Sequence, residues 1–189
     1  MNNDFLTPVE FSHFLLNKHV QPGDTAVDAT AGNGYDTLFL AELVKEKGTV
    51  YSFDIQDEAV ANTIKLLNDY SFLDRVRIFN DSHENIDNYL EETNVSAVIF
   101  NLGYLPGGDK TIKTKASSTV TAVKKSMNFL KKGGIIVLVV YSGHRGGVEE
   151  KEAVLNFLKD LNYKRYNVIK YSYLNQPDFS PELLALIKR

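Results

Sequence analysis

The hydrophobic positions of the chain follow two alternating spacings, which predict strands and helices in turn. Short apolar runs bounded by Gly, Pro, Asn and Asp have the length of buried strands. We expect strands at residues 25–28, 49–54, 75–79, 95–100, 135–141, 163–174 and 182–188. Elsewhere apolar residues recur every three to four positions, the spacing of a helix packed by one face. We expect helices at residues 7–18, 57–70, 84–90, 117–131 and 149–161, and one more between the first strand and Gly48.

The regular alternation of strand and helix predicts an α/β protein with a mostly parallel sheet. Residues 175–181 form a loop of a length that lets the last strand return antiparallel, as a closing hairpin. The expected fold is therefore a doubly wound, Rossmann-like sheet of seven strands. With 189 residues and 43% hydrophobic content, the chain has the size of one domain, residues 1–189.

The first helix has a recognisable start. Thr7 and Glu10 form a capping box around Pro8, so we expect a helix of about residues 7–19 that lies as a cap over the site. Helical spacing also predicts the inward side chains of this helix and of the helix at 57–70. They are Phe11, Phe14 and Leu15 in the first helix and Val60, Ile64 and Leu67 in the second.

The stretch TAVDATAGNGYDTLFLA, residues 25–41, combines a strand, a glycine turn and a helix. Such turns bind either dinucleotides or S-adenosylmethionine. Gly32, Gly34 and Thr37 fill the three fingerprint positions, so the third glycine of the dinucleotide pattern is missing. Asp28 ends the strand, where a carboxylate would repel a pyrophosphate but could hold the ammonium of a methionine moiety, directly or through water. The turn therefore favours S-adenosylmethionine.

Polar residues also follow the second and third strands, at the sheet edge where such folds bind ligands. Asp54 lies about twenty residues after the glycine turn, where an acid binds a ribose diol, and Gln56 could line the adenine. Asp81 or Ser82 could bind the edge of the adenine, and His83 could pack on the ligand. Asp81 or Ser82 could instead only cap the next helix. We favour ligand contact because three strand ends direct polar groups toward one crevice.

Two more loops follow strands at the same edge. Asn101 and the sequence LGYLPGGDK come after the fourth strand, beside the first strand, where a methyl acceptor would lie. Asn101 could orient an amine nucleophile, and Tyr104 could stack on a flat base. After the fifth strand, His144 could accept a proton or contact substrate, and Arg145 could contact phosphate. The alternatives are an ordinary Pro-Gly-Gly loop and a histidine that only braces its own loop.

Charge is distributed unevenly along the chain. The net charge is -3, yet the segment Lys110 to Lys132 holds seven lysines and no acidic residue, so the remainder carries -10. A basic patch suits a polyanion that approaches in one orientation, and a solvated lysine-rich helix face explains the charge equally well. The absence of cysteine excludes disulfides and thiolate chemistry. With no basic leader and no bilayer-length apolar stretch, we expect a soluble cytoplasmic protein.

Six motifs extend over nearly the whole chain: DATAGNGYDTLFLA, FDIQ, NDSHENI, NLGYLPGGDK, VVYSGHRGGVEEK and YSYLNQ. In this order they resemble the bacterial YtqB-like family of class I methyltransferases, first labelled rRNA methylases and now associated with the tRNA methyltransferase MnmM. The combination of NLGYLPGGDK with YSGHRGG is specific. The resemblance implies S-adenosylmethionine-dependent methylation of the aminomethyl group of 5-aminomethyl-2-thiouridine at the tRNA wobble position. The products would be the methylaminomethyl form and S-adenosylhomocysteine.

The resemblance and the strand-end residues together suggest three groups of site residues. The catalytic group is Asn101, Tyr104 and His144. The cofactor-binding group is Asp28, Thr30, Ala31, Gly32, Asn33, Gly34, Asp36, Thr37, Asp54, Ile55, Gln56, Asp81, Ser82 and His83. The substrate-binding group is Leu105, Pro106, Gly107, Gly108, Lys110, Lys113, Lys115, Tyr141, Arg145 and Tyr173. The expected partner is the tRNA anticodon stem–loop, with no metal and no membrane; the sequence does not decide between a monomer and a homodimer.

The expected chemistry consists mainly of alignment. The sulfonium methyl is already activated, so the enzyme holds a neutral amine in line with it and excludes water. An alkylamine is mostly protonated near neutral pH, so the pocket must desolvate it or supply an acceptor, with His144, Tyr141 and Asn101 as candidates. Three alternatives stay open: methylation of rRNA, methylation of a small molecule, and a nucleotide-binding or NAD-dependent domain. The basic segment disfavours the second, and the turn around Asp28 disfavours the third.

Overall fold

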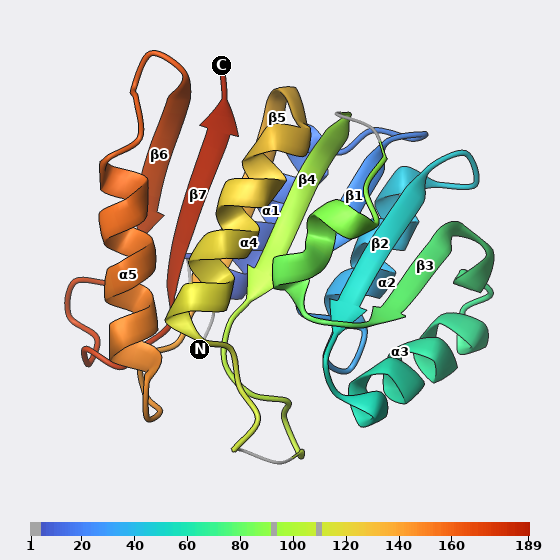
Figure 1. Ribbon diagram of the computed structural model, residues 1–189, viewed down its shortest axis with the longest axis horizontal. Helices are drawn as coiled ribbons and strands as arrows, with labels where there is room; N and C mark the ends of the chain where they lie inside the picture. Colours follow the sequence, from blue (N-terminus) through green and yellow to red (C-terminus); the bar gives the residue numbers. More distant parts are fainter. Residues whose placement is uncertain (1–4, 92–93, 109–110) are drawn as a thin grey trace.

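The computed structural model describes residues 5–91, 94–108 and 111–189, in which a seven-stranded sheet lies between two layers of helices (Figure 1). The strands are β1 (Thr25–Asp28), β2 (Thr49–Asp54), β3 (Val76–Asn80), β4 (Val95–Asn101), β5 (Leu130–Val140), β6 (Tyr166–Tyr171) and β7 (Glu182–Lys188). The α-helices are α1 (Pro8–His19), α2 (Tyr35–Val44), α3 (Asp57–Asp69), α4 (Ala116–Phe129) and α5 (Gly147–Lys159). Two short 3-10 helices are η1 (Leu73–Arg75) and η2 (His83–Asn88).

The order of strands across the sheet is β3-β2-β1-β4-β5-β7-β6. Strands β1 to β5 pair in parallel, whereas β7 lies between β5 and β6 and is antiparallel to both. The predicted doubly wound, mostly parallel sheet with an antiparallel C-terminal strand is confirmed. The chain proceeds outward from β1 to β3 and then returns to β4. The carboxyl ends of β1 and β4 therefore border a crevice at the switch point.

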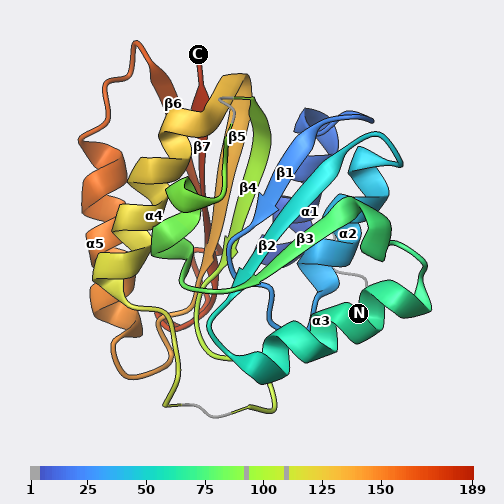
Figure 2. The same ribbon diagram turned by 45° about the vertical axis from the view of Figure 1, so that its right-hand side comes forward.

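Both faces of the sheet are buried at β5, which explains the continuous apolar run of this strand. Ile135, Val137 and Val139 belong to the core beneath α1 and α2. Ile136 and Leu138 alternate with them and belong to the core beneath α4 and α5. Figure 2 shows these two helix layers on opposite sides of the sheet. Successive side chains of a strand point to opposite faces, so a strand covered on both faces is apolar at every position.

Several boundaries and side-chain directions differ from the sequence prediction. The helix expected at 84–90 is the 3-10 helix η2, and the strand expected at 163–174 is limited to β6. β5 begins earlier than expected because Leu130 already pairs with Val95. A bulge follows, and regular pairing with β4 starts at Ile135. Phe14 is 43% exposed and Ile64 is 38% exposed, so their predicted inward positions are wrong.

The rotation of the helices accounts for those two errors. The buried positions of α1 are Pro8, Ser12 and Leu16, and those of α3 are Ala59, Thr63 and Leu67. In α3 two of these positions, Ala59 and Thr63, are small because the glycine turn approaches the helix closely. A β-carbon on Gly34 would lie 2.9 Å from the Cα atom of Thr63. Gln56 precedes α3 and Lys115 precedes α4, and neither side chain makes a capping hydrogen bond.

Candidate active site

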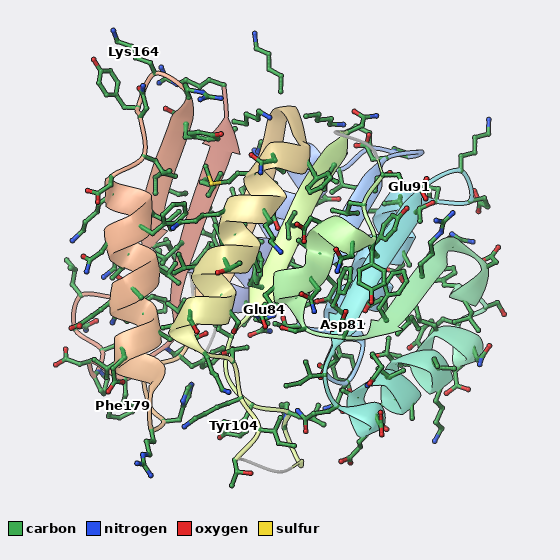
Figure 3. All side chains as sticks on the ribbon, viewed as in Figure 1. Asp81, Glu84, Glu91, Tyr104, Lys164 and Phe179 are labelled. Carbon is green, nitrogen blue, oxygen red and sulfur yellow. The ribbon has the colours of Figure 1, made fainter. Side chains whose placement is uncertain are left out.

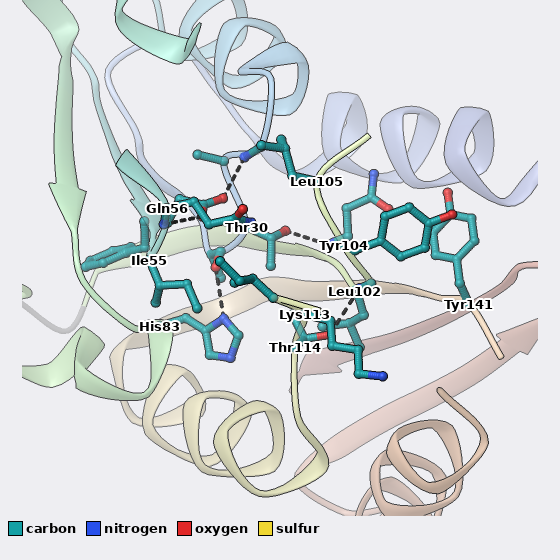
Figure 4. A pocket seen from close by; sticks show the side chains of 18 of the residues that line it. Thr30, Ile55, Gln56, His83, Leu102, Tyr104, Leu105, Lys113, Thr114 and Tyr141 are labelled. Atoms are coloured by element: carbon teal, nitrogen blue, oxygen red, sulfur yellow. Dashed lines mark hydrogen bonds between the residues drawn. The ribbon is translucent and has the colours of Figure 1, made fainter. Parts of the chain in front are cut away.

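A cavity of about 1110 Å³ opens at the carboxyl ends of the parallel strands. Residues from α1 and from the loops after β1, β2, β3, β4 and β5 line it. Gln56, Ile55 and His83 lie at one end, and Tyr104 and Tyr141 lie at the other (Figure 4). The cavity exceeds the roughly 300–1,000 Å³ of common small-molecule sites, so it has room for more than one ligand.

The glycine turn after β1 is held from beneath by a buried carboxylate. Gly32 and Gly34 have φ values of 55° and 85°, in the left-handed region that glycine adopts without strain. The Asp28 carboxylate accepts hydrogen bonds from the Thr30 N–H at 3.0 Å and the Thr37 hydroxyl at 2.6 Å. Burial, followed by the nearby charge of Asp36, raises the pKa of Asp28 to about 7. Asp28 therefore shapes the turn from within the protein.

The second strand end adds a carboxylate that faces the cavity. Asp54 accepts hydrogen bonds from the Gly32 N–H at 2.9 Å and from the Gln56 N–H at 3.0 Å. These two bonds fix the loops after β1 and β2 relative to each other. Ile55, between Asp54 and Gln56, lines the cavity and is 53% exposed. An exposed apolar side chain beside polar groups is a suitable surface for a flat heterocycle.

The third strand end combines a capping group with a buried histidine. The Ser82 hydroxyl accepts a hydrogen bond from the Glu84 N–H at 3.3 Å, so Ser82 caps η2 while it also lines the cavity. Hydrogen bonds from Tyr89, Asn85 and the Ser82 backbone lower the pKa of Asp81.

His83, the next residue, is buried, and its Nδ1–H donates to the Ala29 carbonyl at 3.1 Å. Burial lowers the pKa of His83, which favours the neutral ring. Among the described residues its Nε2 has no partner. His83 therefore lines the cavity as a neutral ring whose Nε2 is itself buried.

The opposite end of the cavity is formed by Asp36 and its partners. The Asp36 carboxylate lies 2.6 Å from His13 Nε2 and accepts a hydrogen bond from the Asn101 side-chain amide at 3.2 Å. The Asn101 backbone N–H donates to the Thr30 hydroxyl at 2.7 Å. Burial, with a contribution from the charge of Asp36, raises the pKa of Tyr141, so its hydroxyl stays neutral. A histidine of α1, a carboxylate of α2 and an amide of β4 thus meet at the switch point.

The loop between β4 and α4 forms the outer wall. Tyr104 pairs with Lys113 in an antiparallel bridge, and the Gly103 N–H donates to the Thr114 hydroxyl at 3.0 Å. The Tyr104 ring meets the His144 ring edge to face, with 6.1 Å between centroids. His144 Nε2 is buried and unpartnered among the residues with described positions. Tyr104 and Phe179 lie at the same end of the molecule, opposite Lys164 (Figure 3).

Residues 50–188 match the family model described as "Putative rRNA methylase". The chain is also 40% identical to a chloroplastic protein of Arabidopsis thaliana named tRNA (mnm(5)s(2)U34)-methyltransferase, over 95% of this chain and 69% of that protein. The chain belongs to this family. It is a methyltransferase.

Two solved structures resemble this methyltransferase over nearly its full length. A crystal structure of a protein of the same description from Clostridium thermocellum has a TM-score of 0.96 and 46% identity, and the match covers 99% of this chain and 100% of that chain. A protein from Streptococcus mutans, described as a methyltransferase and crystallised with SAH, has a TM-score of 0.89 and 37% identity. That match covers 98% of this chain and 99% of the other.

Most of the predicted site residues of this methyltransferase border the cavity. From the catalytic and substrate-binding groups they are Asn101, Tyr104, His144, Leu105, Pro106, Gly107, Lys113, Lys115 and Tyr141. From the cofactor-binding group they are Thr30, Ala31, Gly32, Asn33, Asp36, Asp54, Ile55, Gln56, Asp81, Ser82 and His83. Their contacts with ligands stay predictions. Lys110 lies outside the described residues.

Six predicted site residues do not line the cavity, for identifiable reasons. Three of them are buried around the turn: Asp28 at the end of β1, Gly34 in the turn itself and Thr37 in the first turn of α2. Gly108 packs against Leu105, and Arg145 is exposed outside the cavity. The Tyr173 hydroxyl donates to the carbonyls of Leu6 at 2.9 Å and Phe5 at 3.2 Å, so this residue holds the segment before α1.

His13 and Phe179 line the cavity and were not predicted from the sequence. Each is separated from the strand-end motifs along the chain, so no local pattern identified it.

The lysine-rich segment does not form one free surface. Lys125 pairs with Asp87 and Lys131 pairs with Asp24, both at 2.7 Å. Lys124 lies over the Phe157 ring, 5.1 Å from its centroid. Lys124 is still exposed on α4, whereas Lys125 of α4 and Lys131 of β5 are engaged in ion pairs, so the solvated helix face that the sequence allowed is only partly formed. Lys113 and Lys115, in the loop before α4, are the described lysines of the segment that border the cavity.

In the described part of the chain, no helix has the length and apolar character needed to cross a membrane.

Proposed function

We propose that this methyltransferase methylates the aminomethyl group of 5-aminomethyl-2-thiouridine at the wobble position of tRNA, giving 5-methylaminomethyl-2-thiouridine. The observation that carries the proposal is the composition of the cavity: cofactor-type groups at one end, and Asn101, Tyr104 and two lysines at the other. The Arabidopsis relative, named for a modified uridine at position 34 of tRNA, supports the same substrate class.

The residues at the first end fit S-adenosylmethionine. The carboxylate of Asp54 faces the cavity and favours a cation. Ile55 offers an exposed apolar surface, which suits the face of adenine. We assign the glycine turn and Asp54 to the methionine and ribose portions. When bound, S-adenosylmethionine supplies a methyl group already activated by its positive sulfur.

The residues at the second end suit a nucleotide that is free of base stacking. Tyr104 is 40% exposed at the cavity and can stack on a base. Lys113 and Lys115 border the same cavity and can contact phosphate. The anticodon loop presents unstacked bases in this form, which is how proteins normally read RNA sequence. The side-chain carbonyl of Asn101 can orient an amine, since its NH₂ group is already bonded to Asp36.

The test is to incubate the purified protein with methyl-labelled S-adenosylmethionine and tRNA or rRNA that lacks the methylated nucleoside, then digest the RNA and identify the labelled product. We expect label in 5-methylaminomethyl-2-thiouridine from tRNA, and none when the tRNA carries uridine without the aminomethyl group. Label only in rRNA would refute the tRNA assignment and favour the activity that the family description names.

A further inference from the structure

Asp36 and His13 form a pair that joins two helices at the reacting end of the cavity. We infer that this pair takes a proton from the amine that is to be methylated. Asp36 lies in the first turn of α2 and His13 on α1, and both border the cavity. The inference rests on the proposed function, because only an amine acceptor reaches the enzyme as an ammonium ion near neutral pH.

The geometry of the pair is fixed on both sides. The His13 ring stacks on Phe39, with 4.0 Å between centroids and 8° between planes. The Asp36 carboxylate is 2.6 Å from His13 Nε2 and also accepts a hydrogen bond from Asn101 at 3.2 Å. The side chain of Asp36 is only 10% exposed, whereas that of His13 is 30% exposed. The carboxylate therefore faces the cavity and the histidine connects it to solvent.

An ammonium ion has no lone pair and cannot attack a methyl group. In the proposed step an N–H bond of the ammonium breaks, its electron pair stays on nitrogen, and the proton moves to a carboxylate oxygen of Asp36. With its Nε2 unprotonated, His13 accepts that proton across the short contact, and the imidazolium then releases the proton on Nδ1 to water. The amine becomes neutral while Asn101 holds it, the Asp36 carboxylate is restored, and His13 returns to its starting tautomer by proton exchange with water.

The charged and titratable groups around Asp36 leave it as the main acceptor at this end. His13 faces it from α1, Asp28 from β1 and Tyr141 from β5. Burial, then the charge of Asp36, raises the pKa of Asp28 to about 7 and also raises the pKa of Tyr141. Asp28 is fully buried beneath the turn, and Tyr141 stays a neutral hydroxyl. Of these groups, Asp36 alone is a carboxylate bordering the cavity.

Two variants and a matched control test the inference in the full chain. The variants are Asp36→Asn and His13→Gln. His19→Gln is the control, since His19 lies on the same helix but donates from Nδ1 to the Gly133 carbonyl at 3.0 Å, at the far end of the strands. Three quantities are measured: the pH profile of single-turnover methylation of the aminomethylated stem–loop, the affinity for S-adenosylhomocysteine, and the affinity for stem–loops with and without the aminomethyl group when no cofactor is present.

We expect Asp36→Asn to slow methylation by roughly 10²–10⁴-fold near pH 7, the usual contribution of a general base. His13→Gln should be slower by about tenfold at this pH and recover as the pH rises, because the free amine then loses its proton in solution. Both variants should keep the affinity for S-adenosylhomocysteine. Asp36→Asn should lose the preference for the aminomethylated stem–loop in the absence of cofactor, and His19→Gln should match the wild type.

Other outcomes would overturn the inference. A wild-type pH profile in His13→Gln would exclude the proton route, and this variant decides the matter even if Asp36→Asn fails to fold. Parallel loss of S-adenosylhomocysteine affinity in Asp36→Asn would place the carboxylate on the cofactor instead. A wild-type protein that binds S-adenosylhomocysteine but never methylates the aminomethyl nucleoside would refute the proposed function itself, which is a separate result.

Discussion

At the scale of single residues, burial gives Asp28 and Asp36 different roles. Asp28 has no exposed surface, and its two oxygens accept hydrogen bonds from Thr30 and Thr37. Asp36 borders the cavity and is bonded to side chains of two other elements. A buried carboxylate with internal donors stabilises a loop, whereas one at a cavity wall remains available to a ligand.

The raised pKa of Asp28 predicts a pH-dependent stability. Its pKa is about 7 in the folded protein against 3.8 as the ordinary value, so the native state binds more protons between those limits. The free energy of unfolding contributed by Asp28 therefore falls as the pH rises from about 4 to about 7, by up to about 4 kcal/mol. Asp28→Asn keeps the shape and can donate to Thr37, so urea unfolding at several pH values should show a flatter profile in this window.

Glu10 provides the contrast for that measurement. A backbone hydrogen bond from Thr7 lowers the pKa of Glu10. Ionised Glu10 therefore adds to the free energy of unfolding above the pKa of the unfolded state, and this addition is lost as the pH falls through the pKa of the folded state. Glu10→Gln should change the profile only at the acidic end, below about pH 4.5.

An Asp28→Asn protein with the wild-type slope between about pH 4 and 7 would contradict the Asp28 prediction, because it would show that the Asp28 carboxyl is ionised in the fold.

At the scale of elements, one buried glutamate connects the outer loop of the cavity to two helices. Glu150, in the first turn of α5, is 2% exposed. Its carboxylate accepts hydrogen bonds from the hydroxyls of Thr114 at 2.8 Å and Thr119 at 2.6 Å. Thr114 in turn accepts the Gly103 N–H that closes the base of the loop. The position of Tyr104 over the cavity thus depends on a residue outside it.

Replacing Glu150 with glutamine should loosen this loop. Glutamine keeps the shape but has one acceptor oxygen, so one threonine hydroxyl loses its partner at a cost of about 1–3 kcal/mol. We expect faster limited proteolysis within residues 103–114 and a several-fold higher KM for RNA, with unchanged affinity for S-adenosylhomocysteine. Glu149→Gln, at the exposed neighbouring position, is the control. Equal proteolysis of the two variants would contradict the proposed connection.

At the scale of the whole molecule, the lysines of the segment Lys110 to Lys132 lie in different places, some in ion pairs away from the cavity and some beside it. Lys131 and Asp24 pair beside the amino ends of β5 and β1, at the edge of the sheet opposite the cavity. Lys125 pairs with Asp87 of η2. Lys113 and Lys115 border the cavity. The local charge of the segment therefore overstates the positive charge that a ligand in the cavity meets.

The salt dependence of RNA binding tests which lysines of the segment contact phosphate. Each lysine that contacts phosphate contributes about 0.7 to the slope of log K against log salt for a single strand. Changing Lys113 and Lys115 together to alanine should lower the slope by about 1.4, and changing Lys125 and Lys131 should leave it unchanged. If all seven lysines contacted RNA, the wild-type slope would be near 5. Changing Lys125 and Lys131 would then lower the slope as much as changing Lys113 and Lys115.

Much of the fold and of the cavity wall was predictable because both follow from local patterns and one general rule. Apolar runs predicted the strands, and the glycine turn and Thr7 capping box predicted local geometry that the structure confirms. The carboxyl ends of parallel strands meet at one edge, so residues after successive strands, such as Asp54, His83 and Asn101, were expected to converge. They do border a single cavity.

The remaining features depend on how distant elements dock, which a linear pattern does not contain. The rotation of α1 brings His13 to Asp36 and leaves Phe14 exposed. Packing decided that Asp28 is internal and that Lys131 pairs with Asp24. The sequence by itself thus determined the elements, their parallel order and the chemistry available at the strand ends. The tertiary structure decided which of these side chains are buried or paired and which distant ones, such as His13, join them at the cavity, because burial and pairing are set by contacts between residues far apart in the chain.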